Sequence, residues 1–328
     1  MKYDVITIGG ATRDIAFMTG EGLLIDNKRD LLRQNLLAFE HGAKIKVDRF
    51  VELFGGGAAN AAVNFAHSGF ETACLAKVGN DENGKKIAAN LSRLGVSTRL
   101  LAVDPKEPSG MSFILVAPGG ERIIFASRGA NNGLQVGRKE LSILGLGKWL
   151  YVASLSGDWL PAARQIFSLT GPRIAWNPGA AQYQEGLEKL RPFLERTDVF
   201  FVNKDEAIEL AMSDPRYAKK KSSFFNDVSN LLVIIKETGP KIVVITSGRK
   251  GADAYDGNYY YHQPVLKEKK RVDVTGVGDV FNSSVIAGLE LTGGSIKKAL
   301  RLGAKNTASK IAFFGAQSGL LDLRKIKI

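Results

Sequence analysis

The sequence predicts a doubly wound α/β fold, in which helices cover both faces of a mostly parallel central sheet. Short apolar runs alternate with helical patterns along most of the 328 residues, as in parallel strands joined by crossover helices. The chain is also long enough to bury a large core. In addition, two glycine-rich segments each run directly into a helical pattern, a position from which such folds bind ligands.

The elements of the core follow from the period of the apolar residues. Apolar runs of strand length predict strands at residues 3–8, 72–77, 149–153, 173–176, 199–202, 242–246 and 259–262. Helical spacing predicts helices near residues 59–67, 84–93, 161–169, 187–194, 205–212, 227–238, 280–291 and 296–313.

Two segments, 15–54 and 110–128, break this alternation and predict a small separate β-sheet. Apolar and polar residues alternate in them, and strands are expected at 45–54, 111–116 and 123–126. Pro118-Gly119-Gly120 is expected to form the hairpin turn between the last two strands. The rest of the chain is assigned to the core, namely residues 1–14, 55–109 and 129–328.

The first of these segments also predicts an inserted amphipathic helix near residues 28–40. Apolar side chains recur there at helical spacing, at Leu31, Leu32, Leu36, Leu37 and Phe39. We expect this helix to pack onto its own domain; a partner surface and a cap over the substrate are the alternatives.

The net charge of +12 does not by itself indicate a nucleic-acid partner. Basic residues cluster at 219–221, 267–271 and 324–327, and such runs usually form solvated faces. The second cluster precedes a glycine-rich segment and could steer an anionic nucleotide toward it. Because zinc-finger spacing, an aromatic RNA-binding signature and a basic heptad helix are all missing, we expect no nucleic-acid binding.

The single cysteine, Cys74, lies in an apolar run and is expected to be a small buried hydrophobe in a reducing compartment. No charged-then-apolar leader precedes the first strand, and no apolar run is long enough to cross a bilayer. The sequence therefore predicts a cytoplasmic protein without a membrane partner.

The segment from Val272 to Phe281 predicts an anion-binding loop. Gly276 and Gly278 interrupt the pattern just before a helix, where unpaired backbone N–H groups and the helix dipole favour an anion. A carboxylate at this place, Asp279, is explained if it is a base that takes a proton from an attacking hydroxyl. An N-cap aspartate is the alternative, although it leaves the two glycines unexplained.

A second glycine-rich segment, Gly55-Gly56-Gly57, leads into a helix of small residues that contains Asn60. Glycines let a substrate approach the backbone closely, and an asparagine offers both a donor and an acceptor. The segment has neither the dinucleotide spacing nor the lysine of a Walker loop. Tight packing of a helix on a sheet is the alternative explanation.

Together the two segments resemble the signatures of the ribokinase-like carbohydrate kinase family (phosphofructokinase-B type). The C-terminal signature is matched by DVTGVGD at 273–279, and the N-terminal one from Gly56 through Asn60 to Gly79. Asn203 to Glu206 resembles the N-x-x-E motif of the family, 246–251 its nucleotide loop, and Gly9 to Asp14 follows the first strand. The resemblance implies a ribokinase-like fold whose small sheet is a lid over the sugar site, often also a homodimer surface.

The resemblance assigns roles on the acceptor side of the site. Asp279 would be the catalytic base, and the backbone amides of Gly276, Val277 and Gly278 would form the anion hole. The substrate hydroxyls would contact Asp14, Gly56, Gly57 and Asn60. Arg128 would meet a carboxylate or phosphate on the substrate, with a salt bridge on the lid surface as the alternative.

It also assigns a nucleotide side with ATP and Mg²⁺ as cofactors. Thr246, Gly248 and Gly251 would line the nucleotide, and Asn203 would help to place its phosphates. Glu206 would hold Mg²⁺, largely through water. The spacing of Asn203 and Glu206 equally fits a helix capping box. K⁺ is an optional cofactor, since residues that match a monovalent cation site occur at Asp273, Thr275 and Gly315, whereas Gly319 replaces a common serine.

The implied function is transfer of the γ-phosphate of ATP to a hydroxyl of a small carbohydrate. Gly57 and Ser154 stand where ribokinases have lysine and glutamate, which disfavours ribose itself. A nucleoside kinase of the same family is the alternative, for which Phe17, Phe113 and Phe125 could form a platform under the base, although packing in the lid core is their default. A sugar-binding regulator without catalysis is disfavoured because Asp279 and the glycines are intact.

Overall fold

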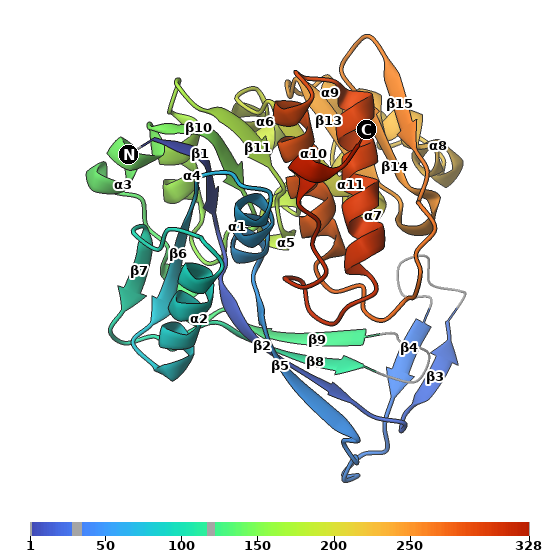
Figure 1. The fold of residues 1–328 in the computed structure, drawn as a ribbon. Helices are drawn as coiled ribbons and strands as arrows, with labels where there is room; N and C mark the ends of the chain where they lie inside the picture. Colours follow the sequence, from blue (N-terminus) through green and yellow to red (C-terminus); the bar gives the residue numbers. More distant parts are fainter. Residues whose placement is uncertain (1, 28–34, 117–121, 328) are drawn as a thin grey trace.

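The computed structural model describes residues 2–27, 35–116 and 122–327, and its centre is a large β-sheet (Figure 1). In the described part of the chain this sheet has nine strands, ordered β15-β14-β13-β12-β11-β10-β1-β6-β7. Neighbours from β7 to β13 are parallel, whereas β14 and β15 are antiparallel. The strands are β1 (Tyr3–Ile8), β6 (Thr72–Gly79), β7 (Leu101–Asp104), β10 (Gly147–Val152), β11 (Arg173–Trp176), β12 (Val199–Asn203), β13 (Ile242–Thr246), β14 (Ala252–Tyr255) and β15 (Tyr260–Gln263).

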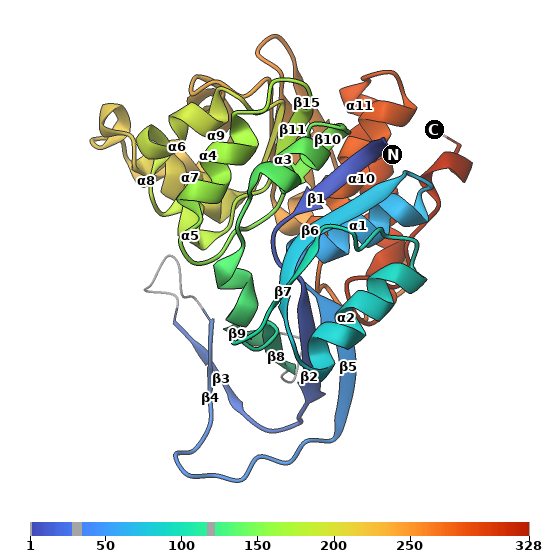
Figure 2. The same ribbon diagram turned by 90° about the vertical axis from the view of Figure 1, so that its left-hand side faces the viewer.

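Helices cover both faces of this sheet, as the alternation of apolar runs predicted (Figure 2). One layer contains α1 (Gly57–His67), α2 (Glu82–Arg93), α10 (Val277–Leu291) and α11 (Ile296–Lys310). The other layer contains α3 (Arg138–Leu144), α4 (Leu160–Phe167), α5 (Ala180–Tyr183), α6 (Leu187–Leu194), α7 (Lys204–Met212), α8 (Ser222–Asn226) and α9 (Val228–Lys236). The short 3-10 helices are η1 (Gly129–Gly133), η2 (Pro215–Tyr217), η3 (Gly248–Lys250) and η4 (Leu323–Lys325). All expected core strands and helices are present, and β7, β14, α3, α5 and α8 are additional.

The two helical layers seal two hydrophobic cores, one on each face of the sheet. Successive residues of β10 alternate between them: Trp149 and Tyr151 pack toward α1 and α10, while Leu150 and Val152 pack toward α4 and α6. Cys74 on β6 is fully buried, as expected for a small hydrophobe. Among the described residues, every helix is too short or too polar to cross a lipid bilayer.

The small sheet is a separate layer beside the core, ordered β5-β2-β8-β9 (Figure 1). Its strands are β2 (Thr12–Met18), β5 (Arg49–Gly55), β8 (Met111–Val116) and β9 (Arg122–Ser127). The expected turn at Pro118 to Gly120 lies outside the described residues, although β8 and β9 pair antiparallel on either side of it. Asp14, expected in the segment that follows the first strand, lies on strand β2.

The inserted helix predicted near residues 28–40 is wrong where the structure describes this segment. Strands β3 (Leu23–Asp26) and β4 (Asn35–Ala38) pair antiparallel, and residues 28–34 lie outside the described residues. Leu24 pairs with Leu37, so backbone pairing overrides the helical spacing of the leucines. Of the expected apolar face, Leu36 is 42% exposed, whereas Leu37 and Phe39 are half-buried.

Candidate active site

The predicted site residues gather at the carboxyl ends of the parallel strands. The loop after β1 leads into β2, which carries Asp14. Asn203 at the end of β12 lies directly opposite Thr246 at the end of β13. Open α/β sheets bind ligands at this edge, because the loops that follow parallel strands converge there.

Asp279 is the third residue of α10, and its carboxyl group faces α1. Asn60 on α1 donates a hydrogen bond from Nδ2 to Asp279 Oδ2 at 2.8 Å. Burial raises the pKa of Asp279 to about 6, the Asn60 hydrogen bond opposes this rise, and the charge of Asp14 adds to it. The N-cap of α10 is Gly276, so the alternative of an N-cap aspartate is wrong.

The loop before α10 is held in place through Asp273. Its carboxylate accepts hydrogen bonds from Thr275 N and Oγ1, at 2.8 and 2.6 Å, and from Gly315 N at 2.8 Å. Gly276 has a left-handed backbone with φ of 69°, and a Cβ there would lie 2.2 Å from Ala316 Cβ. Glycine is therefore required at this position.

Several amides at the start of α10 donate no hydrogen bond to the described residues. Among the residues that the structure describes, no acceptor lies within hydrogen-bond distance of the N–H groups of Gly276, Gly278 and Asp279. Val277 N makes only a long contact of 3.4 Å to Val274 O. Unpaired amides at a helix N-terminus beside a carboxylate can bind an anion and a proton donor together.

Close packing explains the glycines at positions 55 and 56, as well as the access that they give to a ligand. A Cβ on Gly55 would lie 2.0 Å from Asp14 Oδ2, and one on Gly56, with φ of 91°, 2.3 Å from Gly10 O. These two glycines therefore let the backbone pass Asp14 and the β1–β2 loop. Gly57 is different, because its Cβ would be 3.5 Å from Asp279 Oδ1, on the side of the proposed base.

Asn60 is held by a chain of side chains that sequence reasoning missed. Its Oδ1 accepts from Gln317 Nε2 at 3.1 Å, and Gln317 Oε1 accepts from Asn90 Nδ2 at 2.8 Å. Because Oδ1 already has a donor, the amide nitrogen must face Asp279. No local pattern marks Gln317 or Asn90, which lie in a loop and in the middle of α2.

Asp14 is almost completely buried on the same side as Asp279. Thr12 Oγ1 donates to Asp14 Oδ1 at 2.8 Å. Burial raises the pKa of Asp14, while hydrogen bonds from Thr12 and Ser112 and the charge of Arg13 oppose the rise. The charge of Asp14 also acts on Asp279, and two carboxyl groups this close suit a ligand rich in hydroxyl groups.

A pocket of about 470 Å³ adjoins the loop of α10, a size typical of small-molecule sites. It is lined by the predicted nucleotide residues Asn203, Thr246, Gly248 and Gly251 together with Val277 and Gly278. The remaining wall is mainly apolar and was missed by sequence reasoning: Val265, Leu266, Val274, Phe281, Ala304, Ala308 and Ile311. Thr307 Oγ1 in this wall is buried without a hydrogen-bond partner, so a polar ligand atom could pair with it.

Two arginines border this pocket as well. Arg271, from the basic cluster at 267–271, lines it and pairs with Glu268 at 2.7 Å. Arg249 in η3 lines the pocket too. One member of the basic cluster thus borders the pocket, and the steering role stays a prediction.

Asn203 and Glu206 form the capping box that was the alternative to a metal role. Asn203 Oδ1 accepts from Glu206 N and Glu206 Oε2 accepts from Asn203 N, both at 2.9 Å. Burial raises the pKa of Glu206 to about 7, the amide of Asn203 lowers it, and Glu209 and Asp205 raise it further. The described residues contain no cluster of three His, Cys, Asp or Glu that could ligate a metal. One carboxylate oxygen of Glu206 would thus fit a water-mediated Mg²⁺, and a cage of protein ligands would not.

The lid residues do not all face the site. Arg128 is exposed at the start of η1 and forms no ion pair with any residue that the structure describes, so the alternative salt bridge is not seen. Ser112, which hydrogen-bonds Asp14, alternates with Phe113 along β8, and Phe113 pairs with Phe125 and Ile15. Phe113, Phe125 and Phe17 therefore face away from Asp14, which does not favour the alternative of an aromatic platform under a base.

Residues 24–322 match the sequence profile of the pfkB family carbohydrate kinase. An uncharacterized sugar kinase of Archaeoglobus fulgidus is 29% identical, covering 77% of this chain and 96% of that protein. Arabidopsis thaliana ribokinase, solved with ribose and ATP, superposes with a TM-score of 0.80 over 100% of both chains at 20% identity. The nucleoside kinase of Methanocaldococcus jannaschii superposes with a TM-score of 0.73 over 97% of this chain and 95% of that one, at 21% identity.

Proposed function

The chain belongs to the pfkB family of carbohydrate kinases, which makes it a sugar or nucleoside kinase, and we propose that it phosphorylates a small carbohydrate. The γ-phosphoryl group of ATP would pass directly to a hydroxyl of the substrate. One observation carries the proposal: Asp279 joins the two halves of the site. Its loop neighbours Val277 and Gly278 line the nucleotide pocket, while its carboxyl group contacts Asn60 on the other side.

Asp279 would take the proton of the attacking hydroxyl. A hydroxyl is a poor nucleophile until its proton is removed, and a carboxylate with a pKa near 6 is ionised at neutral pH yet still basic. Asn60 would hold the carboxylate in place. The free amides of Gly276 and Gly278 would stabilise the charge on the transferred phosphoryl group.

The remaining residues would bind and orient. Asp14 would accept hydrogen bonds from neighbouring substrate hydroxyls, with Gly56 and Gly57 admitting the sugar ring and Arg128 meeting an anionic group on it. Thr246, Gly248, Gly251 and the apolar wall would bind the nucleoside part of ATP. Bound Mg²⁺, near Asn203 and Glu206, would neutralise phosphate charge.

A carbohydrate is favoured over a nucleoside by the orientation of the lid. Ser112 and Asp14 face the core together, whereas the three phenylalanines that could stack on a base face the other way. Stacking on aromatic rings contributes much of the affinity for bases. A polar lid face suits a ring bearing hydroxyl groups instead.

The outer face of the lid is proposed as a homodimer surface. Phe50 is 66%, Phe113 42% and Phe125 56% exposed on this face. Exposed apolar patches of this kind are typical of protein contacts. Light scattering should show a dimer for the native chain and a monomer for Phe125→Asp, and a native monomer would contradict this part.

The test of the function is an ATP-consumption screen against hexoses, pentoses, sugar acids, sugar phosphates and nucleosides. Turnover of one carbohydrate class by the native chain, and not by Asp279→Asn, is the expected result. The variant should still bind the substrate. Turnover of nucleosides alone would overturn the carbohydrate assignment, and equal turnover by the variant would overturn the role of Asp279.

A further inference from the structure

Lys310, the last residue of α11, is unusual among the described residues because its charged side chain is buried. Its side chain is 0% exposed. Its ammonium group donates to the backbone carbonyl of Asp273 at 2.8 Å and lies 3.7 Å from Asp273 Oδ2. A lysine is almost never fully buried unless its charge is compensated, and here the carboxylate of Asp273 and the carboxyl end of α11 provide the compensation.

This ammonium group acts on the residue that organises the anion-binding loop. The carboxylate of Asp273 already accepts from Thr275 N, Thr275 Oγ1 and Gly315 N. Lys310 holds the carbonyl of the same residue. Both polar groups of Asp273 are thus fixed, and with them the start of the loop that continues to Gly276.

The same place was expected to suit a K⁺ ion, at Asp273, Thr275 and Gly315. An ion ligated by the Asp273 carbonyl would have to sit beside the Lys310 ammonium, which already occupies that carbonyl. Two monovalent cations that contact the same buried carbonyl oxygen would repel each other strongly, because little solvent screens their charges. The residues present therefore do not fit a K⁺ ion.

We infer that the Lys310 ammonium takes the place of a monovalent cation beside the anion hole, so that this enzyme needs no K⁺. The inference rests on the proposed kinase function. Lys310 is a positioning residue, because it acts on the loop through Asp273 and also contributes a permanent positive charge near the phosphate-binding amides. An ammonium group and a K⁺ ion carry the same charge, but the lysine is always present.

The first test compares initial rates of the native enzyme in KCl, NaCl and tetramethylammonium chloride at equal ionic strength. Equal rates are expected. A clear activation by K⁺ would overturn the inference without any variant.

The second test removes the charge. Lys310→Met keeps most of the volume of the stem, and Lys310→Ala leaves a space. Both should lower kcat/KM by at least about tenfold, and K⁺ or NH₄⁺ should restore part of the loss in Lys310→Ala. Lys305→Ala is the matched control on the same helix, because that exposed amine donates to Lys327 O and does not touch Asp273. A folded Lys310 variant with full activity, or with low activity that no cation restores, would contradict the inference.

Thermal denaturation without substrates keeps the inference separate from the kinase function. The Tm of the native chain should be the same in KCl and tetramethylammonium chloride, whereas the Tm of Lys310→Ala should be higher in KCl. This pattern without turnover of any substrate would leave the cation replacement standing and remove the proposed function. A native Tm raised specifically by K⁺ would overturn the replacement.

Discussion

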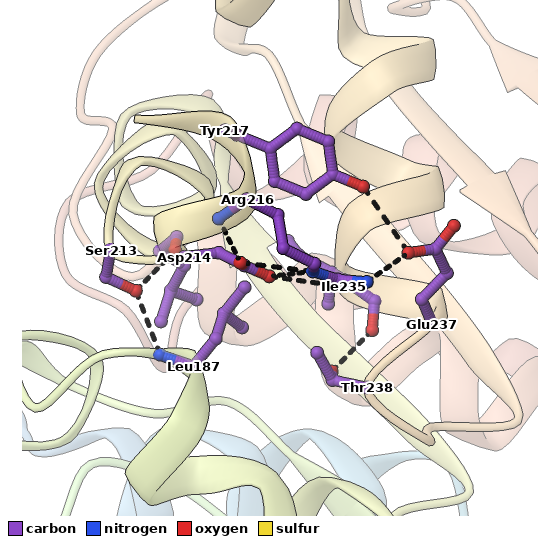
Figure 3. A network of polar contacts seen from close by, with 9 residues as sticks. Leu187, Ser213, Asp214, Arg216, Tyr217, Ile235, Glu237 and Thr238 are labelled. Atoms are coloured by element: carbon purple, nitrogen blue, oxygen red, sulfur yellow. Dashed lines mark hydrogen bonds and ion pairs between the residues drawn. The ribbon is translucent and has the colours of Figure 1, made fainter. Parts of the chain in front are cut away.

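Asp214 and Asp279 both accept side-chain hydrogen bonds, but the partner of Asp214 is a charged arginine and that of Asp279 is a neutral asparagine. Asp214 caps η2 and accepts from Arg216 through Nε and Nη2, at 3.0 and 2.7 Å to Oδ2, and Arg216 continues to Glu237 (Figure 3). Among the described residues, the donor to the Asp279 carboxylate is the neutral amide of Asn60. The Arg216 side chain holds the pKa of Asp214 below its usual value, whereas burial raises that of Asp279 to about 6.

The comparison shows how the surroundings of a carboxylate set its tendency to take up a proton. A guanidinium stabilises the ionised form and uses both oxygens, so Asp214 has little tendency to take up a proton. Burial with a single neutral donor leaves Asp279 fixed in position but still basic. Each of the following predictions tests this contrast, beginning with the largest effect.

Asp279→Asn and Asp214→Asn should differ most in turnover. We expect the first to lower kcat by about 10²–10⁴-fold, because the attacking hydroxyl loses its base. The second should leave kcat unchanged, since its network lies at η2 and not at the pocket. Steady-state kinetics on the substrate found in the screen would measure both, and equal losses would remove the contrast.

The loop that presents Asp279 should tolerate a methyl group at one glycine and not at another. Gly276→Ala places a side chain at φ of 69° and against Ala316, whereas a Cβ on Gly278 meets nothing within 4 Å. We expect Gly276→Ala to lower the Tm by on the order of 2–4 °C and to weaken ATP binding. Gly278→Ala should keep the native Tm in differential scanning calorimetry, and a comparable decrease would show that the loop is not strained at Gly276.

The acid limb of the pH–rate profile should depend on the pKa of Asp279 and on the hydrogen bonds that set it. Activity should fall as the pH drops below about 6, because the protonated carboxyl group cannot act as a base. The Asn60 hydrogen bond lowers this pKa, so Asn60→Ala should move the limb to higher pH. Gln317→Leu should move it in the same direction by less, since it only releases the orientation of Asn60.

Asn90→Ala is the control at the far end of this chain and should shift the limb least. A profile of kcat/KM that is identical in all of these variants would show that the chain from Asn90 to Asp279 does not tune the base. Loss of activity without any change in the profile would point to a structural role instead.

The smallest expected effect is on stability, where the two aspartates should have opposite signs. The folded-state pKa of Asp279 is raised above 3.8, so ionising it destabilises the fold increasingly from about pH 4 to pH 6. Asp279→Asn should therefore raise the Tm at pH 8 and leave it unchanged near pH 4. The folded-state pKa of Asp214 is lowered, so its contribution is present above pH 4 and is lost as the pH falls.

Asp214→Asn should thus lower the Tm at pH 8, on the order of 1–3 °C for a mostly exposed arginine pair, and less at low pH. Thermal melts across this pH range would measure both variants. The same sign for both would mean that burial does not govern Asp279.

Much of the fold could be predicted because its signals are local. Apolar runs and helical periods place β1, β6, β10 to β13 and the long helices correctly, since each pattern lies within one element. Strand β4 was mistaken for part of a helix, because neighbouring leucines such as Leu36 and Leu37 satisfy a helical spacing while backbone pairing with Leu24 on β3 is not visible in the sequence. The direction of Phe113 was missed for the same reason, as it depends on the strand register.

The sequence by itself determined which residues can do the chemistry: the glycine loops, Asp14, Asp279 and the motifs that carry the family resemblance. Their burial and their hydrogen-bond partners depend on the tertiary structure. Asn60 and Asp279 are 219 residues apart, and Gln317 and Asn60 are 257 apart, so no local pattern contains their hydrogen bonds. Likewise, nothing in the sequence distinguishes Lys310 from the other basic residues. Only the packing of α11 buries its ammonium group beside the carboxylate of Asp273.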